Sequence, residues 1–179
     1  VGPNIDILID CHGNFDVPTA ISMAKLLEPF NIGWIEEPVQ PNSNEALKHV
    51  KESVNVPICV GERLYTKWDF VPVLRERLAE YLMPDILWTG GITELYKISA
   101  LAESFYVPVS PHDASGPINI LAGAHTMMTI PNFYKLEINH ASLDSLNSMI
   151  DEPLNIDNGK IQLPARPGLG VNLDEEFIE

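Results

Sequence analysis

The chain has 179 residues, 45% of them hydrophobic, which is enough to enclose one core. Its 25 acidic residues outnumber 11 basic ones and give a net charge of −14, which argues against binding to nucleic acid or to an anionic membrane. The charge does not exclude an anionic small molecule, because a bound metal ion reverses the local sign. No apolar run approaches the length of a membrane span and no signal-peptide pattern opens the chain, so we expect a cytoplasmic protein.

Short apolar segments alternate with helical patterns through most of the chain. Helices are predicted at residues 18–29, 44–53, 67–77, 92–105 and 118–130. Strands are predicted at residues 5–10, 33–36, 56–61, 81–84, 107–110 and 133–137. The first strand is apolar almost throughout, which is typical of a parallel strand covered on both faces. This rhythm predicts an α/β fold that forms most of a (β/α) barrel.

The predicted barrel occupies residues 1–150. Six strands do not close an eight-stranded barrel, so we expect two further strands before residue 1. From residue 141 onward prolines and glycines replace the periodic pattern, and only one short strand, at 160–163, is predicted. Residues 151–179 are therefore interpreted as a C-terminal tail of loops and short strands.

Three carboxylates stand at equal intervals of 26 residues: Asp10, Glu36 and Glu62. Each ends or directly follows a predicted strand, and parallel strands present their carboxyl ends at one face of a barrel. Converging carboxylates repel one another unless a cation lies among them. Because all the ligands are oxygens, the pattern favours Mg²⁺ over zinc. The alternative interpretation is that these residues cap the helices that follow.

Four more polar residues are predicted at the same face. His12 lies two residues beyond Asp10 and is a candidate proton donor, or else a structural or helix-capping histidine. Asp85 and His112 end adjacent predicted strands, so the carboxylate is expected to fix the imidazole tautomer, unless the two are unrelated loop residues. Glu137 ends the last predicted strand and is either a substrate ligand or half of a structural ion pair. No catalytic role is assigned to the remaining histidines, His49, His125 and His140.

These residues stand in motifs that resemble the C-terminal barrel of the enolase superfamily, in its mandelate racemase and muconate-lactonizing group. The likeness runs over the whole chain, and the pattern at 10–12 is most like D-galactonate dehydratase and related acid-sugar dehydratases. Residues 113–115 depart from the galactonate pattern, which leaves the substrate open. The motifs are IDCHG at 9–13, WIEEP at 34–38, GERLY at 61–65, PD at 84–85 with GGITE at 90–94, PH at 111–112 with GPI at 116–118, and PGLG at 167–170.

The resemblance implies a Mg²⁺-dependent lyase that acts on a small sugar acid. It removes the proton α to the carboxylate and eliminates the β-hydroxyl, giving a 2-keto-3-deoxy acid. The implied metal ligands are Asp10, Glu36 and Glu62, with Glu36 rather than Glu37 in that role. The implied catalytic residues are His112 with Asp85 as the base, His12 as the acid, and Glu137.

Two alternatives stay open, a racemase or epimerase of the same superfamily and a non-catalytic homologue. The family's capping domain and first barrel strands are not expected within residues 1–179, so we expect this chain by itself to be incomplete as an enzyme. We further expect a homo-oligomer, with neither a nucleic-acid partner nor a membrane partner.

Overall fold

The computed structural model describes residues 2, 4–139 and 142–178, so His140 lies outside the described residues. The strands are β1 (Leu8–Asp10), β2 (Trp34–Glu36), β3 (Ile58–Val60), β4 (Tyr81–Leu82), β5 (Asn155–Asp157) and β6 (Lys160–Gln162). The helices are α1 (Val17–Leu27), η1 (Glu28–Phe30, a 3₁₀ turn), α2 (Asn44–Ser53), α3 (Lys67–Arg75), α4 (Ile86–Thr89), α5 (Ile92–Glu103), α6 (Pro117–Met127), α7 (Leu143–Asn147) and α8 (Glu175–Ile178).

The five predicted helices are confirmed as α1, α2, α3, α5 and α6, with their ends shifted by no more than three residues. Side-chain caps explain two of the starts. The carboxylate of Asp16 accepts a hydrogen bond from the Thr19 amide at 2.8 Å, and Ser43 Oγ accepts one from the Ala46 amide at 3.1 Å. None of the described helices is long and apolar enough to cross a membrane.

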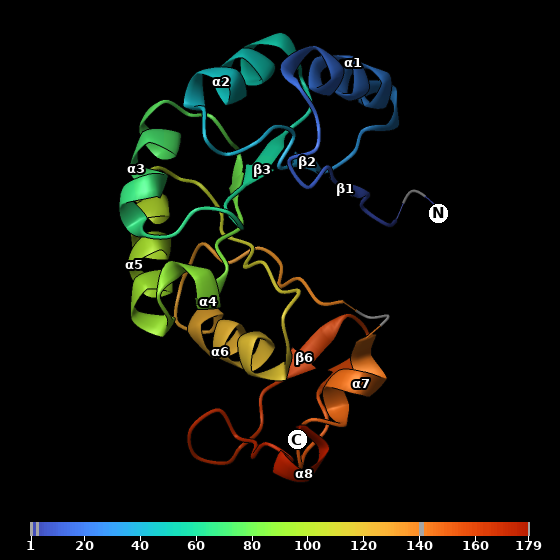
Figure 1. The fold of residues 1–179 in the computed structure, drawn as a ribbon, viewed down its shortest axis with the longest axis vertical. Coiled ribbons are helices and arrows are strands. Elements are labelled where there is room, and N and C mark those ends of the chain that lie inside the picture. Colours follow the sequence, from blue (N-terminus) through green and yellow to red (C-terminus); the bar gives the residue numbers. More distant parts are fainter. Residues whose placement is uncertain (1, 3, 140–141, 179) are drawn as a thin grey trace.

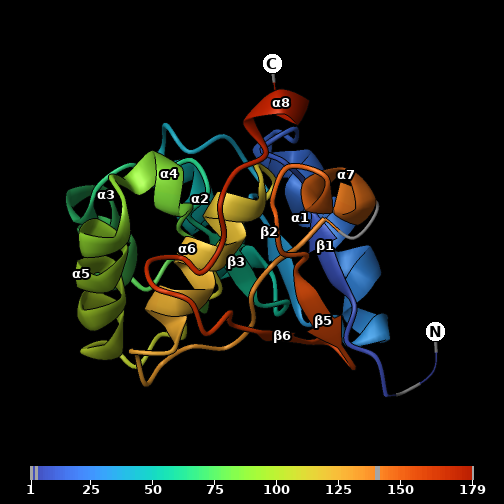
Figure 2. The same cartoon turned by 90° about the horizontal axis from the view of Figure 1, so that it is seen from below.

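Strands β1 to β4 form one parallel sheet in chain order, as the βα rhythm predicts. The register pairs Asp10 with Glu36 and Glu36 with Cys59, so the carboxyl ends of the strands lie side by side. Figures 1 and 2 show helices α1, α2, α3 and α5 outside these strands. The fold is therefore a curved parallel sheet with a helical outer layer, which is part of a barrel.

The strands predicted at 107–110 and 133–137 continue this sheet only as isolated parallel bridges, so their prediction as full strands was wrong. Leu82 pairs with Val109, and Val109 pairs with Phe133. Pro108 and Pro111 lack the backbone N–H that a continuous ladder needs, which explains the interruption. The order of the segments around the arc is still the predicted one.

Side chains alternate across the sheet with a period of two. Ile35, Ile58 and Leu82 face the helices and belong to the main core, whereas Trp34 and Cys59 pack on the inner face. The inner face begins, at the amino ends of the strands, with an aromatic layer. Its ring centroids are 5.0 Å apart for Trp34 and Tyr81 and 5.2 Å apart for Tyr81 and Tyr134.

Strand β1 is not covered on both faces, contrary to the prediction from its apolar sequence. It lies at the end of the sheet, and Ile5, Ile7 and Leu8 expose 60%, 38% and 36% of their surface. Among the described residues β1 pairs only with β2, which leaves its other edge open. An ion pair joins the two ends of the arc, since Lys135 Nζ lies 2.6 Å from Asp6 Oδ2.

The C-terminal region contains more regular structure than its sequence indicates. The strand predicted at 160–163 is β6, and it pairs with β5 in an antiparallel hairpin that was not predicted. Helices α4, α7 and α8 were not predicted either. Leu146, Ile150 and Leu154 pack with Ile120 and Leu121 of α6 in a second small core. The domain division at residue 150 stays a prediction.

Candidate active site

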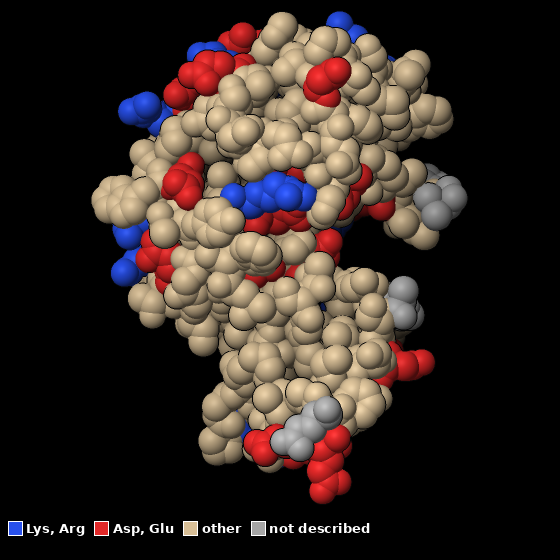
Figure 3. Space-filling model, viewed as in Figure 1, with Lys and Arg blue, Asp and Glu red and all other residues tan. Residues whose placement is uncertain are grey.

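The three equally spaced carboxylates lie together at the carboxyl ends of β1, β2 and β3. Glu36 and Glu62 are buried, with 4% and 7% exposure, while the Asp10 side chain is half exposed. Burial and repulsion from Glu137, Asp10 and Glu62 raise the pKa of Glu36 to about 8, and a hydrogen bond from Trp34 Nε1 offsets part of this. Figure 3 shows acidic side chains in the hollow of this face, with basic atoms lying across them.

The carboxylates are not arranged as a ready-made ligand set. Across residues 2, 4–139 and 142–178, no three His, Cys, Asp or Glu side chains are placed so that they could hold a metal ion as they stand. Glu62 is engaged instead by protein cations: Oε2 lies 3.0 Å from His112 Nε2 and Oε1 lies 3.0 Å from Arg63 Nε. The chemistry of the donors nevertheless suits Mg²⁺, because carboxylate oxygens are its preferred ligands and a divalent cation relieves their repulsion.

The loop after β1 carries His12 to the open side of this cluster. His12 has φ 52°, and hydrogen bonds hold this left-handed turn: its amide donates to Asp10 Oδ1 at 2.7 Å and Arg63 Nη2 donates to its carbonyl at 3.1 Å. Gln40 Nε2 donates to the carbonyl of Gly13 at 2.7 Å. The His12 side chain is 63% exposed, and its Nδ1 lies 3.5 Å from Glu62 Oε1.

His112 and Asp85 meet as the sequence predicts. The two residues form a parallel bridge, and His112 Nδ1 lies 2.8 Å from Asp85 Oδ2. Burial by itself lowers the pKa of His112, but hydrogen bonds to Asp85 and Glu62 outweigh it and raise the pKa to about 10. His112 Nε2 also lies 3.8 Å from Glu137 Oε2. The imidazole thus stands between one fully buried carboxylate and the acidic cluster.

Glu137 borders the cluster on the side of His112. Its Oε2 accepts a hydrogen bond from the Asp113 amide at 2.8 Å, and burial raises the pKa of Glu137. Asp113 is itself buried, with 4% exposure, and burial raises its pKa to about 7. The structure therefore brings all seven predicted residues to one end of the sheet.

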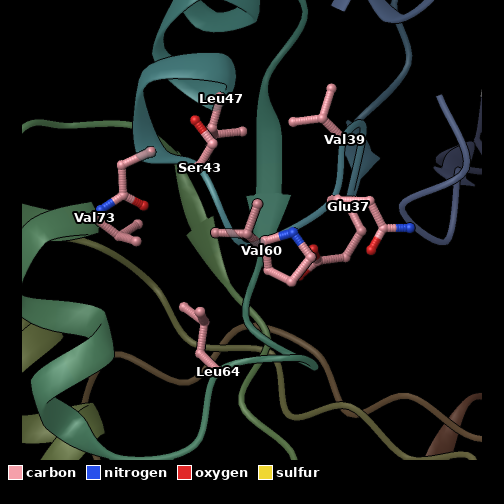
Figure 4. Close-up of a pocket in the computed structure, with 10 residues that line it drawn as sticks. Glu37, Val39, Ser43, Leu47, Val60, Leu64 and Val73 are labelled. Atoms are coloured by element: carbon pink, nitrogen blue, oxygen red, sulfur yellow. The ribbon is translucent and has the colours of Figure 1, made fainter. Parts of the chain in front are cut away.

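Glu37 follows Glu36 but takes a different place. Its side chain accepts a hydrogen bond from the Gly61 amide at 2.7 Å and lines a small pocket on the helix side of the sheet with Val39 and Val60 (Figure 4). Burial raises the pKa of Glu37 to about 7. Glu37 thus braces the strand end that precedes Glu62.

Sequence reasoning gave no role to four residues that support the site: Glu37, Arg63, Asp113 and Asn119. Glu37 and Arg63 lie inside quoted motifs, and Asp113 directly follows His112, so proximity to the motifs was a usable signal. Asn119 lies in a predicted helix, and nothing in its sequence context marks it. Its contact with Asp85 spans 34 positions and depends on the fold.

The fold and the strand-end residues define a β/α-barrel protein whose polar face lies at the carboxyl ends of its strands. Residues 1–177 match the sequence profile of the family described as Enolase C-terminal domain-like. The chain belongs to this family, which confirms the resemblance drawn from its motifs.

Named relatives point in the same direction. The chain is 35% identical over 179 residues to D-xylonate dehydratase of Haloferax volcanii, which covers all of this chain and 43% of the relative. It is 36% identical to D-gluconate/D-galactonate dehydratase of Picrophilus torridus, again over all of this chain and 46% of that protein. The chain thus spans less than half the length of these curated relatives.

Solved structures show the same architecture. A mandelate racemase/muconate lactonizing enzyme-like protein from Rubrobacter xylanophilus superimposes with a TM-score of 0.92 at 39% identity, over 98% of this chain and 45% of that one. An enolase superfamily member from Salmonella Typhimurium gives a TM-score of 0.95 at 34% identity, over 99% and 45% of the two chains.

Proposed function

We propose that this chain carries the catalytic residues of a Mg²⁺-dependent acid-sugar dehydratase. One observation carries the proposal: both histidines contact the same carboxylate. His12 Nδ1 lies 3.5 Å from one oxygen of Glu62 and His112 Nε2 lies 3.0 Å from the other. Two imidazoles beside one acidic cluster are the arrangement that removal of a proton and departure of a hydroxyl need.

The base in this proposal is His112. Asp85 accepts the Nδ1–H hydrogen bond, which leaves Nε2 as the atom that takes the α-proton. The electron pair of the broken C–H bond forms a C=C bond to the β-carbon, and the β-hydroxyl leaves as His12 protonates it. Glu137, next to His112, hydrogen-bonds the substrate. The resulting enol tautomerises to a 2-keto-3-deoxy acid, and water is the second product.

Asp10, Glu36 and Glu62 are the residues that would hold Mg²⁺. When bound, the ion would supply positive charge that offsets the negative charge developing on the substrate carboxylate. The chain's acids would thereby also tolerate an anionic substrate despite the net charge of −14. The substrate class is a small aldonic acid, as the names of the relatives suggest, and we propose a cytoplasmic homo-oligomer as the working form.

A panel of aldonates tests this function on the full-length protein. D-xylonate, D-gluconate, D-galactonate and arabinonate are incubated with and without Mg²⁺, and 2-keto-3-deoxy acid is measured. Product is expected with Mg²⁺ and not after chelation. Exchange of the α-proton with solvent deuterium without loss of water would instead favour the racemase alternative. A folded protein that does neither with any substrate would contradict the proposal.

A further inference from the structure

The carboxylate of Asp85 is the most completely enclosed polar group of the site. It has no exposed surface, and its two oxygens accept hydrogen bonds from opposite sides. Oδ1 accepts the amides of Leu87 at 2.7 Å and Trp88 at 3.4 Å, which makes Asp85 the N-cap of α4. Oδ2 accepts two side-chain donors, His112 Nδ1 at 2.8 Å and Asn119 Nδ2 at 3.3 Å.

Asn119 is a polar residue in an apolar helix. It is 2% exposed and stands beside the buried residues Ile120 and Leu121 in α6. A buried amide costs stability unless its hydrogen bonds are made, and Asn119 Oδ1 has no partner among the described residues. With the amide turned the other way, Oδ1 would face the Asp85 carboxylate and two acceptors would repel. The only bond that accounts for this side chain is the one to Asp85.

Asn119 also joins a third element to the pair. Asp85 and His112 follow adjacent strand segments, whereas Asn119 comes from the second turn of α6. The terminal torsion of an aspartate is soft, so backbone amides on Oδ1 alone leave Oδ2 free to swing. A second donor on Oδ2 restricts this motion and therefore the direction in which the carboxylate receives the imidazole.

We propose that Asn119 is a positioning residue for His112, acting through Asp85. Its amide fixes Oδ2 so that His112 presents Nε2 to the acidic cluster and keeps its proton on Nδ1. The inference deepens the proposed function and rests on it for the role of His112 as the base. Asn119 itself touches neither reacting atom, so it affects the rate of proton abstraction and not the binding of the substrate.

Two variants of the full-length protein remove the donor. Asn119→Leu keeps the shape without hydrogen bonding, and Asn119→Ala keeps helix propensity if the leucine variant does not fold. Thr126→Val on the same helix is the matched control, because Thr126 is 3% exposed and its hydroxyl bonds only to the Ala122 carbonyl of its own helix.

We expect both Asn119 variants to lower kcat for dehydration about 10- to 100-fold, as loss of a supporting hydrogen bond around a site commonly does. Exchange of the substrate α-proton with deuterium should fall by the same factor, while KM stays within about twofold of the parent. The control should leave all three unchanged. Unchanged kcat in both Asn119 variants, or a rise of KM at constant kcat, would overturn the inference.

A readout without turnover separates this inference from the proposed function. In ¹⁵N-labelled protein, the Nδ1–H proton of His112 reports its hydrogen bond to Asp85. We expect its resonance to shift or broaden in Asn119→Leu and to stay in place in Thr126→Val. If the parent acts on none of the aldonates, the function fails while this measurement still decides the geometry. An unshifted resonance in the Asn119 variant contradicts the positioning role.

Discussion

The two ends of the inner face of the sheet differ in character although the same strands build them. At the amino ends Trp34, Tyr81 and Tyr134 form an aromatic layer, and Trp34 is only 2% exposed. Two residues further along β2 the side chain on the same face is Glu36, whose pKa burial and neighbouring acids raise to about 8. The comparison teaches that a packed layer of rings holds the strands, so that a layer of mutually repelling groups can be kept at their other end.

The largest expected effect lies in the polar layer and concerns the rate alone. His112→Asn should lower both dehydration and α-proton exchange about 100- to 10,000-fold, because the base is lost. His12→Asn should lower dehydration to a similar extent and leave exchange, because proton removal does not need the acid. Product formation and deuterium incorporation are measured on the full-length protein. The reverse pattern would show that the two roles are exchanged.

The second prediction breaks the joint between a strand and the polar layer. Gly61 has φ +146°, and a Cβ there would lie 2.8 Å from backbone atoms of Met83. Gly61→Ala should therefore lower the free energy of unfolding by about 2–4 kcal/mol, measured by urea denaturation. Gly116→Ala is the control, since a Cβ at that position meets nothing within 4 Å. Equal stability of the two variants would contradict the account.

The third prediction sharpens the contrast through pH. Burial raises the pKa of Asp113 from 3.8 to about 7, so the folded protein holds a proton that the unfolded chain releases. Stability should therefore fall as the pH rises from about 4 to 7, and Asp113→Asn should flatten this slope and gain on the order of 2 kcal/mol at pH 8. Thermal unfolding across this pH range measures it, with Asp157→Asn on exposed β5 as the control. A variant slope as steep as that of the parent would reject the assignment.

The smallest effect concerns the one hydrogen bond between the layers. Trp34 Nε1 donates to Glu36 Oε2 at 3.3 Å, and Trp34→Phe removes this donor while keeping an aromatic ring. We expect a loss of about 1 kcal/mol in the free energy of unfolding. Trp68→Phe, at a side chain that is 69% exposed, should change it by less than about 0.5 kcal/mol. A similar loss in both variants would mean that ring size alone matters.

The sequence allowed the strand-end residues to be predicted because two regularities coincide there. The apolar runs place the ends of the strands, and equal spacing puts Asp10, Glu36 and Glu62 on successive βα units. Whatever depends on the local run of residues was therefore predictable, including the meeting of Asp85 with His112.

Features that depend on contacts between distant segments were not predictable. Prolines at 108 and 111 reduced two expected strands to single bridges. Histidine and arginine partners engage Glu62 and leave no ready-made metal cage, which spacing alone does not reveal. Asn119 and Gln40 gain their roles from partners 34 and 27 positions away, at separations that carry no periodic signal.

The open edge of β1 has a consequence for handling the protein. A terminal strand with unpaired amides and carbonyls is a template for pairing with another chain, and exposed Ile5 and Ile7 add apolar surface beside it. Residues 1–179 prepared alone should therefore aggregate at a rate that rises with concentration, through intermolecular β-pairing at this edge. A lysine in place of Ile7 would slow such aggregation by charge repulsion between the paired strands.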